Sequence, residues 1–244
     1  VYADSNFFPA AASDGTAIQS AMAVVDTESG AVLAMVGGRD YTVRRGLNRA
    51  TQMRRQPGSA LKPLAVYGPA LELGYTTASV LLDEKTSFGG YTPRNAGDRY
   101  YGLVTMRTAV RNSLNTTAVR LLEEIGLDAS VRYLNKMGIP TQNSDRNLSL
   151  ALGSMTYGVT PVELAAAYVP YANGGVYHQP YCVSRIESAD GSIVYERKES
   201  GKQVISAQNA FLMTSLLQSV VSSGTGTRML AANTPIAGKT GTVS

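Results

Sequence analysis

The chain has 244 residues, of which 44% are hydrophobic and only 16% charged, which suits one large domain and argues against a disordered tail or a coiled coil. No run reaches the roughly 18 apolar residues that span a bilayer, and the N-terminus does not resemble a signal peptide. The net charge is +4, and six arginines lie between Arg39 and Arg55. They indicate a solvated basic loop or contact with an anionic polymer or membrane surface, and no motif points to nucleic acid.

The chain has one cysteine, Cys182, and one histidine, His178. These counts exclude an intrachain disulfide, a cysteine-based metal cluster and a multi-histidine metal site, so we expect neither a metal nor another cofactor. If the protein is an enzyme, its general base is expected to be a residue other than histidine. We expect Cys182 to be a buried small hydrophobic residue and His178 to lie at the surface.

The N-terminal part predicts a linker and then a hairpin. Residues 1–19 are polar and aperiodic, which indicates an incoming linker to a domain over residues 20–244. Two β-rich runs, Ser20–Thr27 and Ala31–Gly37, flank a turn in which Gly30 can supply the positive φ.

A helix-rich middle follows. Periodicity and caps predict helices over Ser59–Leu73, Thr105–Arg111, Asn115–Ile125, Asp128–Met137, 161–172 and 207–221. The first is apolar nearly all round, as in a central buried helix. A second hairpin is predicted from Cys182–Ser188 and Ser192–Lys198, and Pro235–Val243 is predicted to be a final strand. Strands at both ends with helices between them predict an α+β fold, an antiparallel sheet with a helical lobe inserted into it.

The first candidate for chemistry is Ser59-Ala60-Leu61-Lys62, at the start of the apolar helix. Residues three apart share a helix face, so the Ser59 hydroxyl and the Lys62 amine can meet. A serine is a weak nucleophile without a base, and a lysine with a lowered pKa can be that base. A helix cap followed by a surface lysine is the alternative explanation.

Two further motifs follow in the chain. Ser113-Leu114-Asn115 is either a helix cap or a proton-relaying hydroxyl with an amide that holds substrate. Lys239-Thr240-Gly241-Thr242 suits the carboxylate of an extended substrate, or a strand edge protected by lysine. Each motif occurs once, in the order Ser-x-x-Lys, Ser-x-Asn, Lys-Thr-Gly, and this order makes the three together a strong signal.

With these motifs the chain resembles the transpeptidase domain of penicillin-binding proteins, specifically the bifunctional class A type, over about residues 20–242. The resemblance extends to Gln56-Pro57-Gly58 before the nucleophile and to Ser223-Gly224-Thr225-Gly226-Thr227. It implies that Ser59 attacks the D-alanyl-D-alanine bond of a peptidoglycan stem peptide and that Lys62 takes its proton.

The remaining site residues also receive roles from the resemblance. Ser113 would pass a proton to the departing D-alanine, and Asn115 would hold the peptide. The backbone N–H groups of Ser59 and Thr242 would form the oxyanion hole. The segment that grips the terminal carboxylate would comprise Lys239, Thr240, Gly241 and Thr242. An amine of a second stem peptide would complete the cross-link, and β-lactams would acylate Ser59 in the same way.

The resemblance also implies a cellular location for the protein and further C-terminal elements of the family domain. The full-length protein is expected to be membrane-anchored and to act on the extracytoplasmic face of the bacterial cytoplasmic membrane. The family domain continues past the Lys-Thr-Gly strand, so we expect the sheet to lack its C-terminal strands and closing helix and to leave an open edge beside the site. The alternatives are a D,D-carboxypeptidase, a serine β-lactamase, a non-catalytic β-lactam sensor and a structural scaffold.

Overall fold

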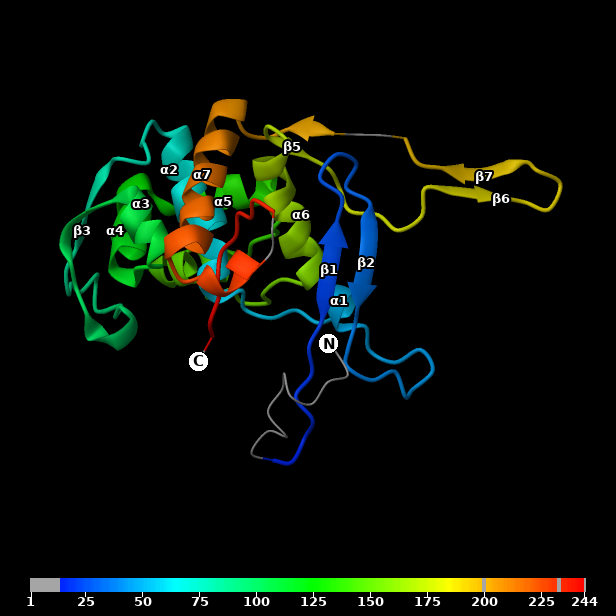
Figure 1. The fold of residues 1–244 in the computed structure, drawn as a ribbon, viewed down its shortest axis with the longest axis horizontal. Helices are drawn as coiled ribbons and strands as arrows, with labels where there is room; N and C mark the ends of the chain where they lie inside the picture. Colours follow the sequence, from blue (N-terminus) through cyan, green and yellow to red (C-terminus); the bar gives the residue numbers. More distant parts are fainter. Residues whose placement is uncertain (1–13, 199–200, 232–233, 244) are drawn as a thin grey trace.

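A helical body with short antiparallel strand pairs around it makes up the fold (Figure 1). The computed structural model describes residues 14–198, 201–231 and 234–243. Its α-helices are α1 (Arg49–Gln52), α2 (Gly68–Glu72), α3 (Met106–Arg111), α4 (Asn115–Ile125), α5 (Leu127–Lys136), α6 (Pro161–Ala172) and α7 (Ala207–Ser223). Its short 3₁₀ and π segments are η2 (Gly58–Leu61), η3 (Pro63–Tyr67), η4 (Ala96–Asp98), η5 (Asn143–Asp145), η6 (Leu148–Leu152) and η7 (Thr227–Ala231).

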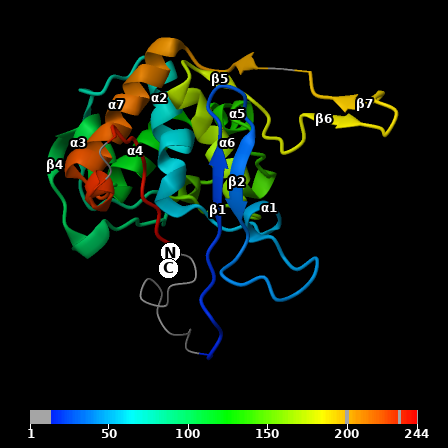
Figure 2. The same cartoon turned by 45° about the vertical axis from the view of Figure 1, so that its right-hand side comes forward.

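The strands of the described residues form two-stranded antiparallel sheets. The strands are β1 (Met22–Val25), β2 (Val32–Val36), β3 (Val80–Asp83), β4 (Gly102–Thr105), β5 (Val176–Tyr177), β6 (Arg185–Glu187), β7 (Ile193–Glu196) and β8 (Lys202–Gln203). They pair as β1–β2, β3–β4, β5–β8 and β6–β7. Both predicted hairpins are confirmed, and the turn between β1 and β2 places Gly30 at φ 76°. The β6–β7 hairpin projects away from the helical body (Figure 2).

The helix ends that the sequence predicted correctly are those with a cap or a stop residue next to them in the chain. Thr160 and Glu163 form a capping box at the start of α6, with hydrogen bonds in both directions, and α6 covers the predicted range 161–172. Helix α4 ends before Gly126, as predicted. The next helix was predicted to begin at Asp128, but α5 begins at Leu127 with Gly126 as its N-cap, and Asp128 lies in its first turn.

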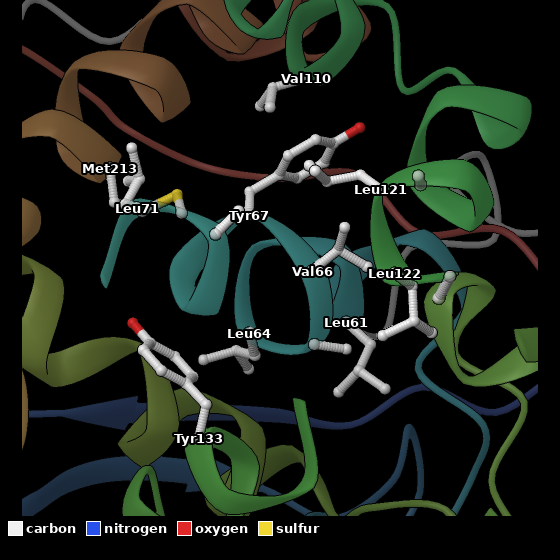
Figure 3. Close-up of a cluster of buried hydrophobic side chains, with 14 of the residues drawn as sticks. Leu61, Leu64, Val66, Tyr67, Leu71, Val110, Leu121, Leu122, Tyr133 and Met213 are labelled. Carbon is white, nitrogen blue, oxygen red and sulfur yellow. The ribbon is translucent and has the colours of Figure 1, made fainter. Parts of the chain in front are cut away.

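The predicted central helix is present but irregular. It runs as 3₁₀ turns in η2, π turns in η3 and α turns in α2. Pro63 has no N–H and cannot donate to the carbonyl of Ser59, which instead accepts from the N–H of Lys62. Its apolar side chains occupy the middle of the core, as Figure 3 shows. The buried residues drawn there include Leu61, Leu64, Val66, Tyr67, Leu121 and Leu122.

The final strand prediction is wrong. Residues 234–243 form no strand, because none of the described residues pairs with them in a ladder. Hydrogen bonds from Gly238 N–H to the carbonyl of Leu217, at 3.3 Å, and between the hydroxyls of Thr240 and Thr225, at 2.7 Å, hold this segment instead. A groove of about 960 Å³ lies between it, β1 and α6. In the described part of the chain β1 pairs only with β2.

Two single residues lie opposite to expectation. His178 is buried, because the β1–β2 turn at Gly30 packs against its Cβ and the segment at Gly201 packs against its ring. Cys182 is exposed. Most of the predicted linker falls outside the described residues, so its role stays a prediction. No helix in the described ranges is both long and apolar enough to cross a bilayer.

Candidate active site

The centre of the site is the Lys62 side chain, which is fully buried at 0% exposure. Its Nζ atom donates to the backbone carbonyls of Ser113 at 2.7 Å and Leu114 at 3.0 Å. It also donates to Oδ1 of Asn115 at 2.6 Å. The first and second motifs are therefore in direct contact, which rules out the snorkelling surface lysine.

The surroundings of Lys62 disfavour its charged form. Burial lowers the pKa of Lys62 well below its usual range, and the positive charge of Lys239 lowers the pKa further. A buried amine that loses its proton readily can act as a general base. Three of its acceptor oxygens lie within 3.0 Å of Nζ, so each of the three N–H groups of the ammonium that forms when a proton arrives has an acceptor.

The Ser113 hydroxyl connects the two lysines. Its Oγ accepts from Nζ of Lys239 at 2.7 Å and lies 3.4 Å from Nζ of Lys62. Ser113 occupies the left-handed region at φ 55°, which is uncommon for a serine and is typical of functional turns. The turn is closed by the N–H of Leu114, which donates to the carbonyl of Ala109 at 3.0 Å. The α3–α4 turn therefore aims one hydroxyl between two amines.

Lys239 is partly exposed and faces the same hydroxyl from the C-terminal segment. Its Nζ also donates to the carbonyl of Thr240 at 2.9 Å. Burial lowers the pKa of Lys239 to about 8. Lys239 therefore keeps most of its charge at neutral pH, and this charge, with burial, favours the neutral amine of Lys62. One site thus holds a base and a cation.

Two residues to which the sequence assigned no role, Asn95 and Asp83, hold Asn115. Oδ1 of Asn95 accepts from the N–H of Asn115 at 2.7 Å, and Nδ2 of Asn95 donates to the fully buried Asp83 at 2.7 Å. The Asp83 carboxylate also accepts from the hydroxyl of Thr116 and from the N–H of Tyr101 at 2.9 Å. Asn95 ends the segment Tyr91-Thr92-Pro93-Arg94-Asn95, which also resembles the family, and Asp83 ends the apolar run of β3. Neither residue lies in one of the three motifs.

The nucleophile candidate, Ser59, lies one turn before Lys62 and is half-buried. The structure brings the other four motif residues together, Lys62, Ser113, Asn115 and Lys239. Among the described residues the Ser59 hydroxyl makes no hydrogen bond. Its turn lies against the third motif: a Cβ on Gly58 would stand 2.5 Å from the carbonyl oxygen of Thr242. A Cβ on Gly241 would stand 2.6 Å from that of Pro57. Glycine at both positions lets the two backbones run this close.

The arrangement suits nucleophilic acyl transfer. A free hydroxyl, a nearby buried amine of low pKa, a second hydroxyl and a cation supply the nucleophile, base, proton relay and anion contact that such chemistry needs. The described residues contain no cluster of three or more histidine, cysteine or acidic side chains that could hold a metal ion.

Comparison with known proteins identifies the fold. Residues 20–244 match the penicillin-binding protein transpeptidase domain. The chain belongs to this family. Penicillin-binding protein 1F of Bacillus subtilis is 45% identical over 221 residues, which cover 90% of this chain and 30% of that protein. The chain thus spans about a third of the length of this curated relative.

Solved structures agree with the assignment. Penicillin-binding protein 1A of Haemophilus influenzae has a TM-score of 0.81 at 29% identity, covering 95% of this chain and 42% of that one. PonA1 of Mycobacterium tuberculosis, solved in complex with penicillin V, has a TM-score of 0.74 at 26% identity, covering 83% of this chain and 56% of that one. The predicted fold class is therefore confirmed, although its sheet is built from separate strand pairs.

Proposed function

We propose that this chain carries the active site of a peptidoglycan D,D-transpeptidase, a serine acyltransferase that joins stem peptides through an ester on Ser59. The observation that carries the proposal is the buried Lys62 amine, which shares the Ser113 hydroxyl with the cationic Lys239. A cap or a surface lysine would need neither the burial nor the second lysine. Membership of the penicillin-binding family supports the same chemistry.

Acylation begins when the neutral amine of Lys62 removes the proton of the Ser59 hydroxyl. Oγ of Ser59 forms a bond to the carbonyl carbon of the penultimate D-alanine, and the N–H groups of Ser59 and Thr242 hold the oxygen that becomes negative. The C–N bond then breaks. The Ser113 hydroxyl gives its proton to the departing D-alanine nitrogen and is reprotonated from Lys62, which lies 3.4 Å away.

Deacylation reverses these steps with a different amine. The amine of a second stem peptide gives a proton to the Lys62–Ser113 pair and attacks the ester, and Ser59 leaves as a hydroxyl. A β-lactam ring opens on Ser59 by the same acylation step, but its leaving nitrogen remains attached, so the adduct persists.

Substrate binding falls to the groups around this centre. Lys239, with the hydroxyls of Thr240 and Thr242 and the backbone of Gly241, binds the terminal carboxylate of the donor. Asn115 accepts from Lys62 through Oδ1 and donates to the carbonyl of Arg94 at 2.7 Å. Its second N–H is left to hold the substrate backbone. The full-length protein acts outside the cytoplasm, where peptidoglycan lies, and is anchored to the membrane by a part outside this chain.

Hydrolytic relatives of this fold are the main rival, since a D,D-carboxypeptidase or β-lactamase needs a group that activates water. One acidic candidate, Glu163 in the first turn of α6, is occupied, because its carboxylate accepts from the N–H of Thr160 at 2.9 Å and pairs with Arg54. The buried Asp83 is likewise occupied by three donors. These contacts favour transfer to an amine over transfer to water.

The deciding experiment supplies a D-alanyl-D-alanine peptide with and without an added amine. We expect the amine-joined product to increase with amine concentration at the expense of the hydrolysed peptide, and S59A to form neither. A yield of hydrolysed peptide that does not change with amine concentration would indicate a carboxypeptidase. A stable penicillin adduct without peptide turnover would indicate a sensor, and no adduct at all would indicate a scaffold.

The pH dependence of acylation follows from the two lysines. The rate constant for penicillin should rise with pH while Lys62 loses its proton, since only the neutral amine is a base. It should fall again above about pH 8 as Lys239 loses the charge that attracts the carboxylate. Stopped-flow acylation from acidic to alkaline pH measures both limbs. K239M should lose the alkaline fall, and a wild-type rate that keeps rising far above pH 8 would contradict the assignment.

A further inference from the structure

The irregular helix leaves the Ser59–Lys62 turn in need of outside support. Because Pro63 lacks an N–H, the regular helical bond to Ser59 cannot form, and the chain passes from 3₁₀ to π turns at this point. In η3 the carbonyl of Pro63 accepts from the N–H of Gly68, five residues on. Such turns bond less regularly than an α-helix, so the orientation of their peptide groups depends on other contacts.

Two tyrosines of α6 supply those contacts. The hydroxyl of Tyr168 donates to the carbonyl of Ala60 at 2.6 Å, and the hydroxyl of Tyr171 donates to the carbonyl of Pro63 at 2.9 Å. The two tyrosines are three residues apart on α6, and their acceptors are three residues apart on the nucleophile helix. One row of hydroxyls therefore meets one row of carbonyls.

The tyrosine pair is itself fixed. The two rings pack edge to face, with centroids 5.8 Å apart and an interplanar angle of 89°. The hydroxyl of Tyr133 on α5 donates to that of Tyr171 at 3.2 Å. Burial raises the pKa of Tyr168 far above its usual range, which keeps its hydroxyl protonated as a donor.

We propose that Tyr168 is a positioning residue for the reaction: its hydroxyl fixes the peptide group between Ser59 and Lys62 and so sets the nucleophile against its base. This inference rests on the proposed function of Ser59. Tyr168 reaches the reacting atoms only through the backbone, at the carbonyl of Ala60. Misplacement of a nucleophile by about 1 Å can cost about 100-fold in rate. A single hydrogen bond that fixes this peptide group can therefore change the acylation rate.

The test compares Y168F with T214V. Thr214 makes the same kind of bond, from its hydroxyl to the carbonyl of Tyr171 at 2.6 Å, but does not touch the Ser59–Lys62 turn. With fluorescent penicillin, we expect Y168F to label to the same final level as the wild type but about 10-fold more slowly. T214V should keep the wild-type rate.

A double-mutant comparison separates positioning from general damage. In a K62M background, Y168F should slow acylation little further, because the base it positions is gone. An equal slowing in both backgrounds, or a lower final level at an unchanged rate, would overturn the proposal and leave Tyr168 a structural residue. Equal slowing in T214V would do the same.

Hydrogen exchange tests, without using acylation, whether Tyr168 holds the Ser59–Lys62 turn. The backbone amides of residues 59–62 and 64–67 should exchange faster in Y168F than in the wild type and T214V. Unchanged exchange would overturn the proposal even if penicillin binds. A wild-type chain that takes no penicillin would defeat the proposed function, while the exchange result would still decide whether Tyr168 holds this turn.

Discussion

Replacement of Lys62 by methionine should slow the acylation of Ser59 by penicillin by about 10²–10⁴-fold, the range that a positioned general base contributes. Methionine fills most of the buried volume but cannot accept a proton. Its side chain would leave the carbonyls of Ser113 and Leu114 without their Nζ donor, so some loss of stability should accompany the loss of rate. Stopped-flow labelling gives the rate, and thermal unfolding gives the stability.

A matched control is K136M, since Lys136 is exposed in the last turn of α5. It should acylate at the wild-type rate. K62R keeps a cation at the position but a guanidinium does not release its proton, so it should be nearly as slow as K62M. A rapid rate in either variant of Lys62 would remove this residue from the role of base.

The second large effect is on stability: G153A should unfold the chain about 6–12 °C below the wild type, which corresponds to about 3 kcal/mol. Gly153 ends η6 in the left-handed region at φ 81°. A Cβ there would lie 2.5 Å from the backbone nitrogen of Gly58 and closer still to its carbonyl oxygen. Backbone cannot move aside as a side chain can, so the nucleophile turn must shift and acylation should also slow.

The control for this prediction is G74A. Gly74 has φ 96°, and no atom lies within 4 Å of a Cβ placed on it. G74A should therefore show only the conformational cost, about 1 kcal/mol, with normal acylation. Equal losses in the two variants would mean that Gly153 does not press against Gly58.

The sequence was most informative where structure depends on neighbours in the chain. The capping box at Thr160 and the glycine stop at Gly126 are local signals, and α6 and α4 follow them. Strands β3 and β4 went unrecognised because their pairing joins residues about 20 positions apart, from Asp83 with Gly102 to Val80 with Thr105. The same reason explains the error at residues 234–243: an extended run becomes a strand only where a partner pairs with it.

The sequence predicted the motif residues of the candidate site, but it did not predict the residues that hold them in place. Ser-x-x-Lys, Ser-x-Asn and Lys-Thr-Gly named Lys62, Ser113, Asn115 and Lys239, which meet in the structure. Asn95 holds the N–H of Asn115, 20 positions away in the chain. Tyr168 holds the carbonyl of Ala60, 108 positions away. No local pattern marks an amide or a tyrosine that serves a distant backbone group.

The most direct test of the account is the mass of the intact chain after treatment with benzylpenicillin, followed by mapping of the modified peptide. The account predicts one covalent penicillin per chain, on the peptide that contains Ser59, and none in S59A. An adduct on another residue such as Ser113, or one that persists in S59A, would contradict it.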